Sequence, residues 1–316
     1  MSMVSINMKC KCGKKAVYSR KYEGNHLCKS CLIKSIESKA KRTIRKYKML
    51  DVGDKIAVAF SGGKDSSSAL YILHNIIEPR RDMELFAILI DEGSGEYRKR
   101  TLEKAKVFCK KIGIKYHVYS FKEEFGKTMK QKVKEIKNSK IKEPCTYCAV
   151  GRRYIINKAA RELGATKIAT GHNLDDEVQA ALLNYVRGDM ARAARMAAVT
   201  DLSRSKELGE LFIPRIKPLR EVPENEAALY AKFKGFDISK GECEFAGGVR
   251  FDTEVFVNDM EAKYPGVKFS ILETFDKLNP YMRQLAEKSG TIKRCKICGE
   301  PGAKDVCKTC ELWREK

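Results

Sequence analysis

The feature that most constrains the fold is a short apolar run that leads directly into a loop of glycine and serine. The run spans residues 56–60, and the loop reads Ser61-Gly62-Gly63-Lys64-Asp65-Ser66-Ser67, with a helical pattern after it. An unbroken apolar run of this length is typical of a parallel strand buried on both faces. Two glycines allow a tight turn that brings backbone N–H groups against an anion, and a helix N-terminus favours phosphate. The segment therefore predicts a strand, a phosphate loop and a helix.

Further apolar runs, with helical patterns between them, extend this prediction along the chain. They span 85–90, 115–119 and 167–170 for the expected strands, and 67–77, 97–112 and 154–163 for the expected helices. Strands that alternate with helices at this spacing predict an α/β fold with a doubly wound, Rossmann-like parallel sheet. Residues 214–219 are expected to form a last strand, and helices to fill 222–289. Ligands in such folds bind outside the carboxyl ends of the strands.

The loop itself selects one class of phosphate site. It lacks the GxxxxGK[ST] spacing of kinase-type loops, and it is not a dinucleotide fingerprint. It resembles the PP-loop signature SGGxDS of ATP pyrophosphatases, which cleave ATP between the α and β phosphates. The alternative is an ordinary glycine turn, which the flanking strand and helix make less plausible. On this basis the expected ATP-binding residues of this half are Ala59, Ser61, Gly62, Gly63, Lys64, Asp65, Ser66, Ser67 and Ile90.

A second loop is expected to complete the nucleotide site. The segment Thr170-Gly171-His172-Asn173-Leu174-Asp175-Asp176-Glu177 follows the fourth strand and opens a helix. Glycine permits close approach of a nucleotide, and carboxylates can hold Mg²⁺ on the pyrophosphate. We therefore expect Gly171 and Asp176 to bind ATP and Asp175 to act in catalysis, with Asp175 or Asp176 holding the metal. Read alone, the segment could be a capping cluster on an ordinary helix, and His172 is expected to be structural.

Eight of the twelve cysteines form two sets near the ends of the chain. Cys295-Lys-Ile-Cys298 and Cys307-Lys-Thr-Cys310 have the spacing of a structural zinc ribbon. The N-terminal set is less regular and contains Cys10, Cys12, Cys28 and Cys31. His26 could replace one of these thiolates, so a site of three cysteines and one histidine is the alternative. Two Zn²⁺ sites are expected.

An interior pair of cysteines, Cys145 and Cys148, has no second pair nearby. Cys243 could complete a set of three thiolates, which can hold a [4Fe–4S] cluster with one iron open to an exogenous ligand. A redox-active CxxC with an unrelated Cys243 and a third zinc site are the alternatives, and spacing alone does not choose among the three. Cys109 lies on the apolar face of an expected helix and is assigned to the core.

The charge of the chain indicates a polyanionic partner. Its 316 residues include 63 Lys and Arg against 41 Asp and Glu, an excess of +22, and residues 1–50 alone contribute +12. Residues 122–142 are expected to form an exposed basic helix. This helix, the lysines of 1–50, and Arg187, Arg192 and Arg195 are candidates to bind the phosphates of a nucleic acid; a solvated face is the alternative for each basic run. No apolar run approaches the roughly 18 to 20 residues that cross a bilayer, so no membrane partner is expected. The chain has no secretory signal, and its thiols suit the reducing cytoplasm.

Together these segments predict four parts. They are a zinc module with a basic helix at 1–50, a PP-loop ATPase domain at 51–220, a helical extension at 221–289 that carries Cys243, and a zinc ribbon at 290–316. The PP-loop, the GHNLDD segment, the central CxxC with its downstream cysteine and the terminal cysteine sets occur here in one order. This combination resembles the tRNA 2-thiouridine synthetase family over nearly the whole chain. The related 2-thiocytidine synthetases differ at the zinc-bearing ends.

The resemblance implies a cofactor, a reaction and partners. Cys145, Cys148 and Cys243 would bind the [4Fe–4S] cluster, and the protein would be a homodimer. ATP with Mg²⁺ would adenylate the C2 oxygen of a tRNA uridine, and sulfur from free sulfide or a ubiquitin-like thiocarboxylate carrier would then replace AMP. Asp65, Arg152 and Asp175 are the expected catalytic residues. The chain has Arg152 where the family commonly has Lys, and Cys-Glu-Phe-Ala around Cys243 where the family usually has Cys-Pro-Tyr-Ala.

Two other functions remain open from the sequence. The first is a non-catalytic zinc-ribbon protein that binds RNA and whose ATP-binding core controls that binding. The second is another PP-loop tRNA modifier, of the lysidine or 2-thiocytidine type. The lysidine type would need no cluster, and a binding protein would form no AMP.

Overall fold

A six-stranded sheet forms the centre of the protein in the computed structural model, which describes residues 8–136, 143–200, 211–239, 241, 243–245, 249–286 and 293–314. The strand order is β5-β4-β3-β6-β8-β7, with five parallel strands and an antiparallel edge strand β7. The strands are β3 (Lys55–Ala59), β4 (Glu84–Asp91), β5 (Lys115–Ser120), β6 (Lys167–Ala169), β7 (Val199–Thr200) and β8 (Arg215–Ile216). The predicted doubly wound parallel sheet is confirmed, and β7 is an addition that the sequence did not indicate.

The position of β3 decides where a ligand can bind. The chain runs outward from β3 through β4 to β5, then returns to the other side of β3 as β6 and β8. Neighbouring connections therefore leave β3 and β6 in opposite directions and open a crevice between their carboxyl ends. The glycine-serine loop follows β3, and the Thr170–Gly171 turn follows β6.

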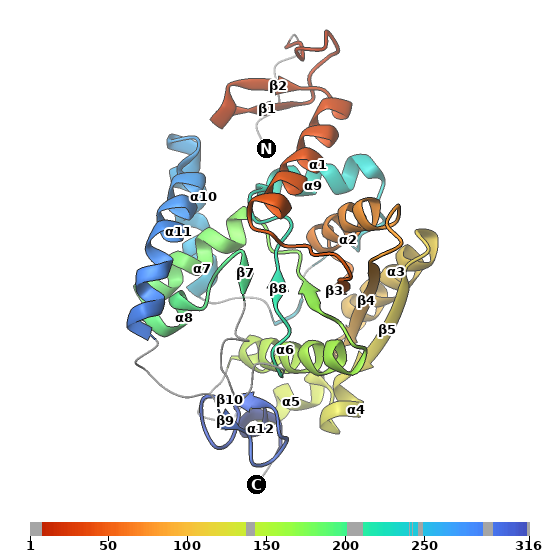
Figure 1. The fold of residues 1–316 in the computed structure, drawn as a ribbon, viewed down its shortest axis with the longest axis vertical. Coiled ribbons are helices and arrows are strands. Elements are labelled where there is room, and N and C mark those ends of the chain that lie inside the picture. Colours follow the sequence, from red (N-terminus) through yellow and green to blue (C-terminus); the bar gives the residue numbers. More distant parts are fainter. Residues whose placement is uncertain are drawn as a thin grey trace.

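Helices cover both faces of the sheet (Figure 1). These are α2 (Lys64–Ile77), α3 (Glu96–Lys111) and α6 (Pro144–Glu162). Alternate residues of β3 point to opposite faces, so Ile56 and Val58 join the core that includes residues of α2 and α3, while Ala57 joins the core beside α6. Cys109 is fully buried in the first core, as predicted.

The lysine-rich segment after β5 differs from its prediction. It forms two short helices, α4 (Phe121–Phe125) and α5 (Met129–Glu135), in place of one exposed basic helix. Gly126, at φ 73°, ends α4, and Thr128 caps α5. Phe121, Phe125 and Met129 are buried beneath α6, so apolar side chains spaced among the lysines bend the segment onto the core. Residues 137–142 of the expected helix lie outside the described residues.

The later helices pack in two separate places. They are α7 (Leu174–Val186), α8 (Met190–Ala194), α9 (Glu224–Lys234), α10 (Val249–Lys263) and α11 (Val267–Ala286). Helix α9 lies against α1 and α2, whereas α10 and α11 lie against α7 and α8. The helical content predicted for 222–289 is therefore found, and its two halves contact different parts of the core.

The two cysteine modules lie at opposite ends of the molecule (Figure 1). The N-terminal module contains β1 (Tyr18–Arg20), the 3₁₀ helix η1 (Lys21–Glu23), β2 (Asn25–Leu27) and α1 (Lys29–Lys46). The C-terminal module contains β9 (Lys293–Arg294), β10 (Pro301–Gly302) and α12 (Lys308–Trp313). Within the described residues, no helix has the length and apolar character needed to cross a membrane.

Candidate active site

The glycine-serine loop is held in one shape by its own side chains. Ser61 Oγ lies 2.9 Å from Ser66 Oγ, and Ser66 Oγ donates to the carbonyl of Gly63 at 3.1 Å. Gly62 has φ +79°, and a Cβ there would lie 2.9 Å from the carbonyl oxygen of Thr101. Only glycine suits both the left-handed backbone and this close approach. The turn of the loop thus packs against α3, and Ser61 and Ser66 face one another where the loop joins α2.

A cavity of about 470 Å³ lies at the carboxyl ends of the central strands. Seven of the predicted site residues line it: Ala59, Ser61, Asp65, Ser66, Ile90, Arg152 and Gly171. Gly62, Gly63, Lys64 and Ser67 are not among its lining residues. The ammonium of Lys64 instead lies 2.7 Å from Glu224 and 2.9 Å from Asp65, and these carboxylates raise its pKa against the opposing effect of burial.

The second loop lies so close to the first that a side chain at Gly171 would not fit between them. A Cβ on Gly171 would lie 2.7 Å from the backbone nitrogen of Ser66 and 2.8 Å from the carbonyl carbon of Asp65. Backbone atoms cannot move aside as a flexible side chain can, so glycine is required here. His172 also lines the cavity, and its Nδ1 lies 2.8 Å from Thr170 Oγ1. The two loops together form one wall of the cavity.

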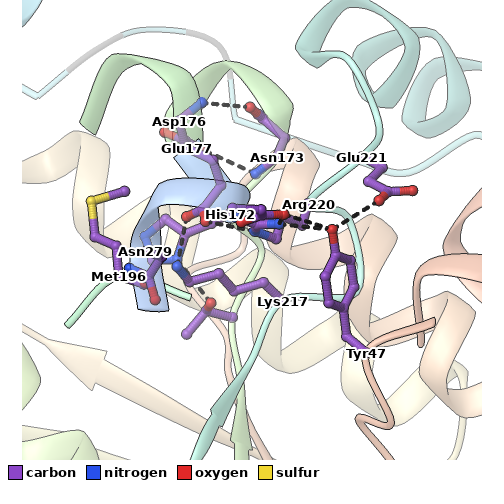
Figure 2. Close-up of polar contacts among 12 residues, drawn as sticks. Tyr47, His172, Asn173, Asp176, Glu177, Met196, Lys217, Arg220, Glu221 and Asn279 are labelled. Atoms are coloured by element: carbon purple, nitrogen blue, oxygen red, sulfur yellow. Dashed lines mark hydrogen bonds and ion pairs between the residues drawn. The ribbon is translucent and has the colours of Figure 1, made fainter. Parts of the chain in front are cut away.

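Asp65 and Asp176 form the acidic part of the site. Burial raises the pKa of Asp65, and the carboxylate of Asp176 adds to that rise. Asn173 donates from Nδ2 to Asp65 at 3.2 Å and forms a capping box with Asp176, shown in Figure 2. Two nearby carboxylates with a shared amide partner provide the oxygen ligands that Mg²⁺ prefers.

Asp175 lies elsewhere, which corrects its expected place at the nucleotide. Its buried carboxylate accepts from the ammonium of Lys268 on α11 and from the backbone N–H of Glu224 at 2.8 Å. Neither Asp175 nor Asp176 is among the residues that line the cavity, but only Asp176 is close enough to Asp65 to raise its pKa. Successive residues of an α-helix point about 100° apart, so Asp176 shares the side of α7 near Asp65 while Asp175 faces α11. Asp175 joins α7 to α9 and α11.

A buried ion network supports the second loop from behind (Figure 2). Glu177 accepts from Lys217 at 2.7 Å and from Arg220 at 3.0 Å. Burial opposes ionisation of Glu177, but these two cations outweigh it and lower its pKa. Arg220 also binds Asp276 and the hydroxyl of Tyr47. Lys217 lines the cavity. The sequence did not reveal its role because 214–219 was interpreted only as a strand, and no local motif marks Arg220.

A second network joins the first loop to α6. Arg98 donates to the carbonyl oxygens of Ser61 and Ile90, at 2.5 and 3.0 Å, and is paired with the buried Glu92. Arg152 Nη1 lies 3.7 Å from the same Glu92 carboxylate. Arg98 therefore locks the ends of β3 and β4 together, and Glu92 holds Arg152 beside them. No local motif marks Arg98 or Glu92 in the sequence.

Helix α6 carries both members of the interior cysteine pair. Cys145 Sγ donates to the carbonyl of Phe245 at 2.9 Å, which brings the segment of Cys243 to the start of α6. Burial raises the pKa of Cys145 and that of Cys148, the latter to about 11, and the charge of Cys243 contributes to both shifts. The contact of Cys145 with Phe245 and the electrostatic effect of Cys243 on both thiols indicate that the three cysteines lie near one another.

The two terminal sets differ from the interior cysteines in spacing. The ligand atoms of Cys10, Cys12, Cys28 and Cys31 lie within 4.8 Å of one another, as do those of Cys295, Cys298, Cys307 and Cys310. Each set fits one tetrahedral zinc, and His26 belongs to neither. Across the described ranges no other group of three such residues meets this limit. Cys145, Cys148 and Cys243 are thus spaced too widely for a single ion, which disfavours a third zinc and leaves room for a larger cluster.

The parallel sheet, the glycine-serine loop at its switch point and the cavity beside it define a PP-loop nucleotide-binding protein. A family model described as "PP-loop domain" matches residues 33–243. A second, described as "2-thiouridine synthetase TtuA, N-terminal LIM domain", matches residues 9–33. The chain belongs to the tRNA 2-thiouridine synthetase family.

Three similar proteins span nearly the same length. The "tRNA-5-methyluridine(54) 2-sulfurtransferase" of Pyrococcus horikoshii is 35% identical, over 97% of this chain and 94% of its own. The "Cytoplasmic tRNA 2-thiolation protein 1" of Drosophila pseudoobscura pseudoobscura is 36% identical, over 97% and 87%. The solved structure of the U34-tRNA thiolase NcsA from Methanococcus maripaludis, with its [4Fe–4S] cluster, is 33% identical, with a TM-score of 0.80 over 97% of this chain and 96% of that chain.

Proposed function

We propose that this protein is a tRNA-uridine 2-sulfurtransferase that consumes ATP and yields 2-thiouridine, AMP and pyrophosphate. One observation carries the proposal. Ala149, Arg152, Arg153 and Ile156 of α6 line the nucleotide cavity, and Cys145 and Cys148 lie one turn earlier on the same helix. A site for activating an oxygen and a site for holding sulfur therefore share one rigid element. The relatives named for tRNA 2-thiolation support this assignment.

The residues of the cavity have distinct parts in the activation step. The uracil C2 oxygen is a poor leaving group, so it first attacks the α-phosphate of ATP and becomes an adenylate. Ser61, Ser66 and the loop backbone bind the pyrophosphate that leaves. Asp65 and Asp176 would hold Mg²⁺ on it, which is one of the two pairings expected from the sequence. Arg152, oriented by Glu92, offsets the charge that develops at the α-phosphate. Attack by sulfide at C2 then expels AMP and leaves the C2–S bond.

The cofactor assignments follow the cysteine chemistry. Cys145, Cys148 and Cys243 would hold a [4Fe–4S] cluster, whose fourth iron would keep sulfide beside the cavity. Cys10, Cys12, Cys28 and Cys31 would hold one Zn²⁺, and Cys295, Cys298, Cys307 and Cys310 the other. Backbone N–H groups of Cys307 and Cys310 already donate to Cys295 Sγ and Cys307 Sγ, at 3.2 and 3.4 Å, which suits thiolates that carry negative charge.

The central test compares two cysteines. Cys243→Ala, purified and reconstituted without oxygen, is expected to lose thiolation and cluster iron while it keeps both zincs. Cys109→Ala is the matched control, because Cys109 is fully buried on α3 outside the cavity. Iron and zinc are counted by mass spectrometry, and thiolation by nucleoside analysis of an unmodified tRNA. A Cys243→Ala protein that is free of iron and fully active would overturn the cluster assignment.

The same assay separates the other functions. A protein that only binds RNA forms no AMP when tRNA is added, and a lysidine-type enzyme is active without iron. A 2-thiocytidine-type enzyme yields a modified cytidine. Relatives named for U34 and for 5-methyluridine 54 have similar identity to this chain, so mapping the modified nucleotide by mass spectrometry of tRNA fragments identifies the target.

The sulfur donor and the cellular site belong to the proposal as well. Free sulfide or a thiocarboxylated ubiquitin-like carrier would supply sulfur; activity with each donor, at matched sulfur concentration, distinguishes them. We place the protein in the cytoplasm, as the printed name of the Drosophila relative supports.

A homodimer is the proposed assembly. Leu278, Tyr281 and Leu285 are exposed at spacings of three and four residues on α11, and such a stripe is typical of a face that another helix covers. A second copy would bury it by a two-fold contact. Light scattering is expected to give a dimer for the wild type and a monomer for Tyr281→Glu with Leu285→Glu. A monomeric wild type would reject the assembly.

A further inference from the structure

A second cavity adjoins the nucleotide cavity and shares a wall with it. Its volume is about 390 Å³, and it lies between α6, the β7–β8 edge and the C-terminal module. Arg153, Thr200 and Arg215 line both cavities. Thr200 and Arg215 are register partners in the β7–β8 pair. The two cavities therefore meet along one wall made from α6 and the edge of the sheet, and we refer to the second cavity as the ribbon-side recess.

Helix geometry explains why the wall carries Arg153. Residues 149, 152, 153 and 156 line the nucleotide cavity, while 150, 153, 154 and 157 line the ribbon-side recess. Each set follows the spacing of one helix face, so the cavities occupy neighbouring faces of α6. Arg153 belongs to both faces and lies on the ridge between the cavities.

The cations of this wall lack carboxylate partners. Within the described ranges neither Arg153 nor Arg215 forms an ion pair, whereas Arg161 on the same helix binds Glu300. Burial and the charges of Arg215, Arg192 and Arg152 lower the pKa of Arg153 to about 10. Burial also lowers the pKa of Arg215. Cations gathered this closely in a recess are stabilised when a ligand brings negative charge.

The positions of these arginines favour a ligand with several successive phosphate groups over a single anion. The phosphates of ATP have their own binding groups in the loop at the far side of the nucleotide cavity, among them Ser61 and Ser66. The unpaired arginines continue from that cavity into the recess, whose lining also includes Arg192, Lys308 and the aromatic ring of Phe212. Arginines beside an aromatic ring are the usual groups that bind single-stranded nucleic acid.

We propose that the ribbon-side recess binds the RNA backbone next to the target uridine, with Arg153 and Arg215 contacting its phosphates. The inference rests on the proposed tRNA substrate and deepens it. The strand passes between α6 and the C-terminal module, and the uridine reaches the ATP across the shared wall. Thr200 provides a hydroxyl at the same crossing point. The recess thus sets which side of the nucleotide cavity the RNA enters.

The test measures tRNA and ATP binding separately in the full-length protein loaded with its metals. Arg153→Gln with Arg215→Gln is expected to weaken binding of a labelled tRNA transcript by on the order of tenfold. It should also reduce the slope of log affinity against log salt by about 1 to 2, because each lost phosphate contact lowers that slope by somewhat under one. ATP affinity, measured without RNA, should fall less than tRNA affinity, because Arg153 and Arg215 line the nucleotide cavity but the loop groups that hold the phosphates of ATP remain.

Controls keep the outcome interpretable. Arg81→Gln with Lys110→Gln removes two exposed charges at the opposite edge of the sheet, and should leave affinity and slope near wild type. Arg153→Lys keeps the charge, so it should bind tRNA with most of the wild-type affinity. It therefore tests the role of the charge even if the double variant folds poorly. Equal tRNA binding in the wall and control variants, or a loss confined to ATP, would overturn the inference. A wild type that neither binds tRNA nor forms AMP with it would instead reject the proposed function.

Discussion

The two cysteine modules are alike in chemistry and differ in what they are attached to. The N-terminal module is joined to α9 by a buried ion pair, in which Arg20 donates to Glu226 at 2.6 and 2.8 Å and Tyr22 adds a hydroxyl. The C-terminal module packs against α6 through α12, and the Trp313 ring of α12 stacks on Phe125 of α4 with centroids 4.6 Å apart.

The difference indicates separate tasks for two similar units. Helix α9 does not line the nucleotide cavity, whereas α6 lines it and carries Cys145 and Cys148. Trp313 Nε1 donates to the carbonyl of Tyr147, between these two cysteines, at 3.1 Å. Loss of the C-terminal module should therefore disturb the site directly, while loss of the N-terminal module should release a basic helix and leave the site intact.

Removing one zinc ligand from each module gives the largest expected contrast. Cys310→Ser should lose one zinc and most of the cluster iron, because small zinc modules owe their folding to the metal and α12 would no longer brace α6. Cys28→Ser should lose one zinc and keep its iron. Both metals are counted after anaerobic purification. Equal iron loss in the two variants would contradict the division of tasks.

Breaking the N-terminal anchor should loosen that module alone. Glu226→Gln removes the buried carboxylate from Arg20 and leaves it only the partly exposed Glu23 at 3.0 Å. Removing one partner of a buried pair costs up to about 3–5 kcal/mol. Limited proteolysis should then cut within residues 1–50 while cluster iron stays constant. Glu221→Gln is the control, since its partner Lys46 is 60% exposed, and such a pair contributes about 0–1 kcal/mol. Similar proteolysis of both variants would show that Glu226 has no special role in anchoring the N-terminal module.

A milder change tests the anchor of the C-terminal module. Trp313→Phe keeps an aromatic ring but removes the indole N–H that donates to the Tyr147 carbonyl, at a cost of about 0.5–1.5 kcal/mol. The electron paramagnetic resonance spectrum of the reduced cluster should change, because the backbone between its two ligands shifts. Tyr22→Phe removes a hydroxyl from the other anchor and should leave the spectrum unchanged. An unchanged spectrum in Trp313→Phe would show that the two anchors do not differ in this respect.

The smallest expected effect is a dependence on pH. Burial opposes ionisation of Glu23 in the N-terminal module, but its hydrogen bond to Arg20 outweighs burial and lowers its pKa below 4.5. A lowered folded-state pKa gives stability that is present above 4.5 and is lost as pH falls through the lowered value. The stabilities of wild type and Glu23→Gln, obtained from melting curves, should differ at pH 7 by less than about 1 kcal/mol, and should converge as the pH falls through the lowered pKa of Glu23. Effects of acid on the zinc thiolates are common to both proteins and cancel in the difference.

Sequence reasoning succeeded where neighbouring residues determine the structure. The strand, glycine loop and helix at 55–77 are contiguous, so their pattern alone predicted the loop and its position in the sheet. The expected helix at 122–142 failed because Gly126 and buried phenylalanines outweigh the spacing of its lysines. Asp175 and Asp176 have the same chemistry, and only the rotation of α7 against α11 separates their environments.

The remaining site residues depend on long-range packing. Arg98, Arg153 and Arg215 come from three elements that meet only when the sheet is assembled. Each looks like an ordinary surface cation in the sequence. Arg98 is identified by its contacts with Glu92 and two backbone carbonyls, and Arg153 and Arg215 by the lack of an ion pair among the described residues, which no spacing along the chain reveals.

The distance between the interior cysteines along the chain has a consequence for how the protein matures. Cys10 to Cys31 are all present once the first 31 residues have left the ribosome, so the first zinc can be acquired early. Cys145 and Cys243 are separated by 98 residues, and the brace at Trp313 follows Cys243 by a further 70. If these cysteines hold the proposed cluster, it can be added only after residue 243 has been synthesised, and chains truncated before that residue would collect the first zinc but no cluster.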